Sequence, residues 1–261
     1  MFDCHLHSRV SFDGISTAAE MAIAAKKAGL REICFTDHLD YDPLEQMGVL
    51  AFDTEAYNQE YDPLQIPGLT IGKGLEFGML EDNILQLRQD LSRRHFDFVI
   101  GSIHFVDDLD VYFEPFWQGK TVWEAEQRFL EGTLSCVRVH DDFDVLGHLT
   151  YLGKTDAHPS PRPIRLSDHR ETVEEILRTL VAKEKGLEIN TSGIDSCGDF
   201  LPGAEYVRLF RELGGKIITI GSDAHAAARV GQYAGRACQL AKEIFGYVCT
   251  FSDRKPIFHT L

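Results

Sequence analysis

The stretch FDCHLH, residues 2–7, is a short, mostly apolar run that ends in two histidines. Alternate residues of a strand point to the same face, so we expect His5 and His7 to lie side by side at the end of a buried β-strand. Six more apolar runs of strand length follow along the chain. Six of the seven runs end in residues of metal-binding type: His5-Leu6-His7, Asp37-His38, Glu76, Ser102-Ile103-His104, Gly147-His148 and Ser222-Asp223-Ala224-His225.

The apolar runs alternate with helical patterns, and capping boxes at Thr17-x-x-Glu20 and Thr121-x-x-Glu124 mark the start of two helices. We expect helices at about 17–29, 83–93, 122–139, 168–185, 204–213 and 232–245, and strands at 2–6, 33–36, 70–75, 98–102, 144–147, 187–190 and 216–221. Such alternation implies right-handed crossovers and a parallel sheet. The sequence therefore predicts an α/β, TIM-like barrel one unit short of eight, with a doubly wound open sheet as the alternative.

The size and charge of the chain narrow its possible partners. Its 261 residues, 44% hydrophobic and 26% charged, suit a single domain over residues 1–261. The net charge of -15 argues against a nucleic-acid polymer or an anionic membrane as partner, but not against a small phosphorylated substrate. The six cysteines form no Cys-x-x-Cys pair, and no apolar run is long enough to span a bilayer. We expect a cytoplasmic protein with reduced thiols, and the sequence predicts no oligomeric state.

The polar strand ends are candidate metal ligands, because imidazoles and carboxylates hold Zn, Mn or Fe. In a parallel barrel the C-terminal strand ends meet on one face. Each of these groups alone is more often a hydrogen-bonded polar residue at a sheet edge. Together they would cost several kcal/mol per unpaired charge unless cations compensate them. The sequence therefore predicts a metal site at the C-terminal strand ends.

The ordered motifs resemble those of the polymerase and histidinol phosphatase (PHP) family. They are His5-Leu6-His7-Ser8, Ser11-Phe12-Asp13-Gly14, Thr36-Asp37-His38, Gly74-Leu75-Glu76, Gly101-Ser102-Ile103-His104, Gly147-His148 and Gly221-Ser222-Asp223-Ala224-His225. Residues 76–78, 98–104, 143–148 and 188–190 and the tail 246–256 are similar to the histidinol-phosphatase branch. The resemblance implies a distorted (β/α)7 barrel that carries up to three divalent metals.

The resemblance also implies how the ligands divide. One metal takes His5, His7, Glu76 and Asp223; a second shares Glu76 and adds His104 and His148; a third takes Asp13, His38 and His225. Asp13 departs from the histidine common among relatives and is a harder ligand. Glu76, Asp223 and His225 are the predicted catalytic residues. Two metals ~4 Å apart would activate a bridging hydroxide for in-line attack at phosphorus.

Long loops follow several strand ends, at 39–68, 105–120, 154–166 and 191–202, where barrel enzymes build their pockets. Four arginines near them are candidate phosphate contacts: Arg9, Arg162, Arg165 and Arg229, with Arg162 preferred because prolines flank it. The acidic and aromatic stretch 107–117 is either a lid that pairs with a substrate ammonium or a packed surface loop. The remaining histidines, His95, His140, His158, His169 and His259, are expected at the surface.

The function predicted is a metal-dependent phosphomonoesterase, a histidinol-phosphatase that converts L-histidinol phosphate to L-histidinol and phosphate in histidine biosynthesis. One alternative is a PHP phosphoesterase acting on nucleotides or nucleic-acid ends. Another is a non-catalytic, metal-binding regulatory module. A degenerate module would have lost several ligands, whereas eight of the nine positions carry the usual type and Asp13 a competent substitute.

Overall fold

The computed structural model describes residues 1–44 and 50–261. Its central sheet has seven principal parallel strands that pair in chain order. They are β1 (Phe2–Leu6), β2 (Glu32–Phe35), β4 (Thr70–Gly78), β5 (Phe98–Ser102), β8 (Val145–Leu146), β9 (Gly186–Asn190) and β10 (Ile218–Gly221).

The sheet curls until its first and last strands meet. The His7 N–H donates to the carbonyl of Ala224 and the Asp223 N–H to that of His5, both at 2.9 Å. The edge of β1 that does not face β2 is thus covered by the segment that follows β10. An open, doubly wound sheet would leave these edges apart, so the predicted barrel is confirmed.

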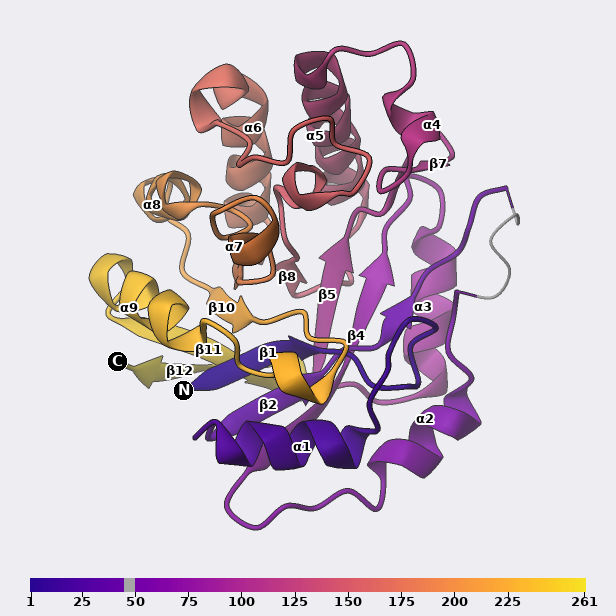
Figure 1. Ribbon diagram of the computed structural model, residues 1–261, viewed down its shortest axis with the longest axis vertical. Helices are drawn as coiled ribbons and strands as arrows, with labels where there is room; N and C mark the ends of the chain where they lie inside the picture. The colour runs from indigo at the N-terminus through magenta and orange to yellow at the C-terminus, as the bar shows by residue number, and fades with distance from the viewer. Residues whose placement is uncertain (45–49) are drawn as a thin grey trace.

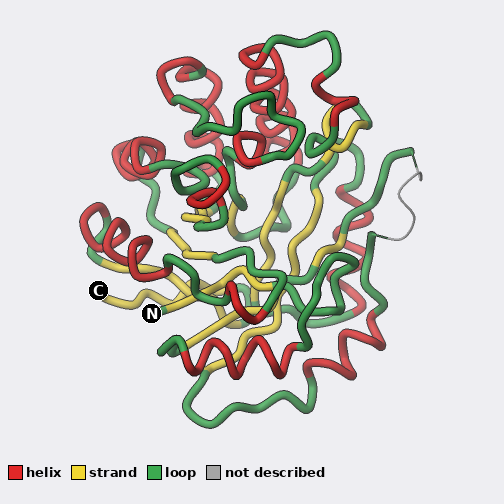
Figure 2. The backbone as a smooth tube through the Cα atoms, viewed as in Figure 1, coloured by secondary structure: helices red, strands yellow, loops and turns green. Residues whose placement is uncertain are grey.

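Helices pack around the outside of the strands (Figures 1 and 2). They are α1 (Ala18–Lys27), α3 (Ile84–Arg93), α5 (Val122–Val139), α6 (Arg170–Ala182), α8 (Ala204–Glu212) and α9 (Ala234–Ile244). Both predicted capping boxes form, with the Thr17 and Thr121 hydroxyls accepting from Glu20 N and Glu124 N. These boxes satisfy backbone donors that the first helical turn leaves free, and so fix where each helix begins.

The buried hydrophobic side chains form two clusters. A large cluster fills the space between helices and strands, and a smaller one joins Cys4, Cys34, Phe98, Ile100, Val145 and Phe251. Phe251 comes from a C-terminal hairpin, β11 (Tyr247–Ser252) and β12 (Lys255–Thr260). This apolar plug lies toward the beginnings of the strands, which leaves the opposite ends for polar side chains. All six cysteines are free thiols, as expected.

The long loops contain short elements that the sequence pattern did not reveal. The stretch 39–68 contains α2 (Thr54–Tyr61), and its residues 45–49 lie outside the described residues. Other short elements are β3 (His38–Leu39), β6 (Phe105–Val106), β7 (Leu109–Asp110), α4 (Glu114–Trp117), α7 (Gly193–Ser196), and the 3-10 turns at Tyr151–Lys154, Leu166–Asp168 and Ala227–Arg229. Elements of two to four residues are too short for periodicity to show, because tertiary contacts hold them.

Three histidines contradict the expectation of surface positions. His140 is buried and its Nε2 lies 2.7 Å from the Leu80 carbonyl. His158 and His169 are also buried, near the fully buried carboxylate of Glu126. A polar partner in the core offsets the free-energy cost of burying an imidazole. The sequence near each histidine does not indicate that partner. Among the described residues, no helix has the length and apolar character needed to cross a membrane.

Candidate metal centre

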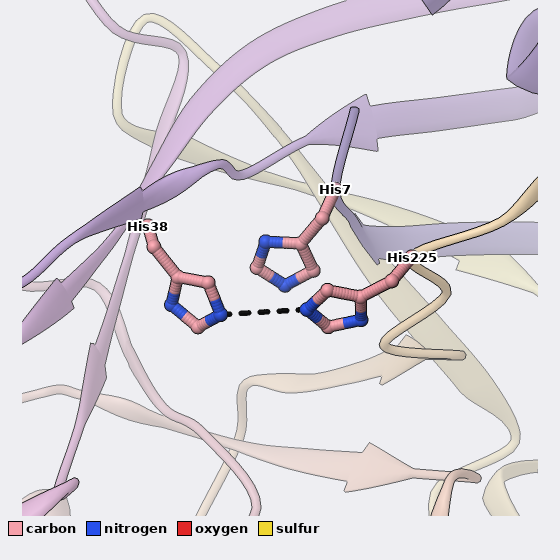
Figure 3. Close-up of side chains that lie close together, drawn as sticks. All are labelled: His7, His38 and His225. Atoms are coloured by element: carbon pink, nitrogen blue, oxygen red, sulfur yellow. Dashed lines mark hydrogen bonds between the residues drawn. The ribbon is translucent and has the colours of Figure 1, made fainter. Parts of the chain in front are cut away.

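The strand ends bring the other eight predicted ligands around Glu76. β2 pairs with the first half of β4, and β3 pairs with its second half, which puts His38 directly opposite Glu76. Figure 3 shows His7, His38 and His225 converging from three separate segments. The ring of His7 stacks on those of His38 and His225, with centroids 4.3 and 4.1 Å apart.

Glycines before the ligands allow this close approach. A Cβ at Gly221 would lie 2.1 Å from Glu188 Oε1 and 2.4 Å from His5 Cβ. Any side chain there would push β10 away from β1 and displace the Asp223 and His225 that follow. The glycine in the Gly221-Ser222-Asp223 motif is therefore required by packing at the site.

The first predicted ligand set has the spacing of donors on one ion. His5 Nε2 lies 3.2 Å from Glu76 Oε2 and 3.7 Å from Asp223 Oδ1, and His7 Nε2 lies 3.4 Å from both oxygens. Two ligands 2.0–2.1 Å from a tetrahedral zinc ion are about 3.3 Å apart. These four separations therefore match those of ligands on one tetrahedral cation.

The other two sets share this spacing in part. Glu76 Oε1 lies 2.8 Å from His148 Nε2 and 3.6 Å from His104 Nε2. His38 Nε2 and His225 Nε2 are 3.4 Å apart, and Asp13 Oδ2 lies 3.7 and 3.1 Å from them. The two oxygens of Glu76 thus face different ligand sets. His7 also lies close enough to His38 and His225 to join the third set, and Asp40 close enough to His38 and His104 to form a group of its own.

Several buried atoms at the centre of the site lack a hydrogen-bond partner. Among the described residues they are His5 Nε2, His7 Nε2, His38 Nδ1 and Glu76 Oε2. A buried polar atom without a partner costs about 1–3 kcal/mol, so four of them in contact would be strongly destabilising. Divalent cations would give partners to His5 Nε2, His7 Nε2 and Glu76 Oε2, while His38 Nδ1 lies 3.2 Å from Asp40 Oδ2. The residues present therefore fit the metals that the motifs imply.

Outer contacts hold the imidazoles with Nε2 directed inward. The Nδ1–H of His5 donates to Glu188 Oε1 at 2.7 Å, that of His7 to Ser11 Oγ at 3.1 Å, and that of His104 to Asp40 Oδ1 at 2.8 Å. An acceptor at Nδ1 fixes the tautomer and leaves the Nε2 lone pair free for a metal.

Sequence reasoning missed Glu188 and Asp40 as parts of the site. Glu188 also accepts from the backbone N–H of His148 at 2.8 Å, so one carboxylate orients residues of two ligand sets. It lies between Leu187 and Ile189 in β9, and a charged residue inside a buried central strand is the signal that pointed to it. Asp40 lies two residues after His38, the same spacing that joins His5 to His7.

The comparisons with known proteins assign the family. The PHP domain model matches residues 3–192. The chain belongs to the PHP family. It is 34% identical to the histidinol-phosphatase of Lactococcus lactis subsp. lactis over 97% of this chain and 95% of that protein. A Clostridium acetobutylicum protein named "Probable histidinol-phosphatase" is 29% identical over 99% of this chain and 96% of its own length.

A solved structure of the Lactococcus lactis enzyme is similar across the whole fold. It has a TM-score of 0.88 and 32% identity, and the match covers 98% of each chain. That structure is described as histidinol phosphate phosphatase complexed with zinc, L-histidinol and phosphate.

The electrostatics of this PHP site favour ionised carboxylates. Burial opposes ionisation of Glu76, but His5 and His38 outweigh it and hold its pKa well below the usual value. Burial likewise opposes ionisation of Asp223, and Lys154 and His5 outweigh it, so its pKa is also lowered. Burial opposes the charged form of His5, but Glu188 and Glu76 outweigh it and raise its pKa, so a metal at this position would displace a proton from His5.

A cavity of about 490 Å³ opens over the PHP ligands, lined by His38, His104, His148, Asp223 and His225 among others. Of the four predicted phosphate contacts, Arg229 lines this cavity, while Arg9, Arg162 and Arg165 do not. Arg9 pairs with Glu60 at 2.9 Å and Arg162 with Glu126 at 3.0 Å. Their part in phosphate binding stays a prediction.

Lys154 is a cation of the cavity that the sequence analysis overlooked. Its Nζ donates to Asp223 Oδ2 at 2.8 Å and to Ser192 Oγ at 2.7 Å. The 3-10 turn Tyr151–Lys154 directs it there, six residues after His148. No local pattern in the sequence indicates that this lysine turns back toward β10.

Proposed function

We propose that this PHP chain is a metal-dependent phosphomonoesterase that hydrolyses L-histidinol phosphate to L-histidinol and phosphate. The observation that carries the proposal is the set of ligand-type residues around Glu76 in a fold that matches, over 98% of its length, an enzyme whose structure holds zinc, L-histidinol and phosphate. A cavity of about 490 Å³ is of the size that takes a small metabolite.

The proposed holders of up to three ions are the nine predicted ligands, His5, His7, Asp13, His38, Glu76, His104, His148, Asp223 and His225. Bound divalent metals, whether zinc, manganese or iron, would polarise phosphoryl oxygens and lower the pKa of water at the site. Glu76 is proposed to bridge two ions, since its two oxygens face different ligand sets at 3.2 and 2.8 Å from His5 and His148.

The chain's own side chains orient the substrate. Lys154 and Arg229 line the cavity and are proposed to donate charge-assisted hydrogen bonds to phosphate oxygens. Asp223 Oδ2 holds the Lys154 ammonium in place, while its Oδ1 faces His5 and His7. Asp223 therefore links the phosphate-binding cation to the first ligand set, and His225 is proposed to fix the third set beside it.

We further propose that residues 1–261 act as one domain, because the C-terminal hairpin supplies Phe251 to the barrel's own core. A cytoplasmic location is proposed from the six free thiols. The net charge of -15 supports a small substrate rather than a nucleic-acid polymer.

Phosphate release from L-histidinol phosphate, measured before and after chelation, tests the proposed function. The metal-replete protein is expected to turn the substrate over, to lose activity with a strong chelator, and to regain it with zinc, manganese or iron. If the protein hydrolysed the substrate at the same rate after a chelator had removed its metal, the proposal would be refuted. Hydrolysis of a nucleoside monophosphate but not of L-histidinol phosphate would favour the nucleotide alternative.

A further inference from the structure

The hairpin of β6 and β7 places one carboxylate in the cavity and keeps two others out of it. Asp110, at the end of β7, lines the cavity. Asp107 instead pairs with Arg128 of α5 at 2.6 Å, and Asp108 is exposed at the turn. Asp107 and Asp108 form the turn of the hairpin with positive φ, 55° and 61°, and neither lines the cavity. Only Asp110 of these three is therefore positioned to meet a bound substrate.

Among the described residues that line the cavity, Asp40, Asp13 and Asp223 each have a histidine or lysine partner, whereas the half-buried Asp110 and the exposed Asp156 have none. Asp40 lies 2.8 Å from His104, Asp13 lies 3.1 Å from His225, and Asp223 lies 2.8 Å from Lys154. Among residues 1–44 and 50–261, the Asp110 carboxylate has one hydrogen-bond partner: its Oδ1 accepts from the Tyr112 N–H at 2.8 Å. A half-buried anion that faces a cavity without a cation is ready to receive one from a ligand.

Aromatic rings line the same cavity as this carboxylate. Tyr112 and Phe113 follow Asp110 directly and line the same cavity, with Phe113 47% exposed. The partly buried ring of Tyr151 lies 6.4 Å from that of Tyr112 and 4.8 Å from that of His148. This wall thus runs from the second ligand set to Asp110. It offers flat faces to a planar group and a negative charge to an ammonium.

We infer, on the basis of the phosphatase function proposed above, that Asp110 determines specificity by receiving a cationic group of a phosphomonoester whose phosphate lies at the metal ligands. The substrate class is then a phosphate ester that carries an ammonium a few bonds from the ester oxygen, with a planar ring against Tyr112 and Tyr151. Phosphomonoesters without an ammonium reach the same ligands but leave Asp110 unpaired, and so bind and react less well.

The test compares Asp110→Asn with Asp108→Asn in metal-replete protein. Asparagine keeps the shape of Asp110 and an oxygen for the Tyr112 N–H while removing the charge. The Asp108 variant makes the same change on the same hairpin outside the cavity, at a positive φ that asparagine tolerates. Thermal melting and metal analysis check that both variants remain folded and loaded with metal.

Two substrate pairs differ only in the ammonium: L-histidinol phosphate against 3-(imidazol-4-yl)propyl phosphate, and phosphoethanolamine against ethyl phosphate. Asp110→Asn is expected to lower the kcat/KM preference for the ammonium member by about 10- to 100-fold, with Asp108→Asn like the wild type. An unchanged preference in Asp110→Asn, or none in the wild type, would overturn the inference. The wild type could fail to hydrolyse L-histidinol phosphate but prefer phosphoethanolamine to ethyl phosphate, with that preference lost in Asp110→Asn. In that case the proposed substrate is wrong while the role of Asp110 stands.

Discussion

Replacing Glu76 by glutamine removes one charge from the point where two ligand sets meet. Oε2 of Glu76 lies 3.2 and 3.4 Å from the Nε2 atoms of His5 and His7, and Oε1 lies 2.8 Å from His148 Nε2. A glutamine keeps one oxygen and directs an NH2 group at the other set, where it repels a cation. We therefore expect both sets to lose affinity and turnover to fall by about 10³-fold or more, roughly 4 kcal/mol in transition-state stabilisation.

The assay combines phosphate release with metal analysis of the same sample. Glu126→Gln is the matched control, because Glu126 is equally buried but pairs with Arg162 and His169 away from the ligands. The control is expected to keep the wild-type metal content, and Glu76→Gln to lose at least one ion per chain. A Glu76→Gln protein with full metal content and near-normal turnover would refute the bridging role.

Three further substitutions test the surroundings of the cluster. Glu188→Gln weakens the hold on His5 and His148 and should lower metal affinity by about 10- to 100-fold in a competition titration with a chelator; unchanged affinity would remove Glu188 from the site. Lys154→Met should lower kcat/KM for every phosphomonoester by about 10-fold or more at constant metal content, since a charge-assisted phosphate contact is lost; equal kinetics would exclude that contact. Arg229→Ala should raise the KM for phosphomonoesters, whereas the control Arg178→Ala, on the far face of α6, should not. If the KM of Arg229→Ala stays at the wild-type value, the phosphate contact would be assigned to Arg162, Arg9 or Arg165 instead.

The barrel was predictable from the sequence because buried parallel strands leave uniform apolar runs. β5, FVIGS at 98–102, is buried at every position and was placed at its exact bounds, as were β1 and α5. The capping boxes predicted where two helices begin, because their hydrogen bonds join residues that are close together in the sequence. The (β/α)7 order followed from these local signals.

The periphery of the site was not predictable from local pattern. Lys154 reaches Asp223 across 69 residues of sequence, and Glu188 reaches His5 across 183. Such pairs depend on the closure of the barrel, which no window of sequence contains. The same reason explains why His158 and His169 were expected at the surface: their partner Glu126 lies on α5, a helix that otherwise has an ordinary amphipathic pattern.

The most direct test of the account is kcat/KM for L-histidinol phosphate against that for adenosine monophosphate, measured on one metal-replete preparation. The acidic and aromatic wall beside the ligands should favour the ammonium-bearing substrate by at least about 10²-fold, since an unpaired charge on either side costs several kcal/mol. Equal or faster turnover of the nucleotide would contradict the account and identify the chain as a PHP phosphoesterase of nucleotides.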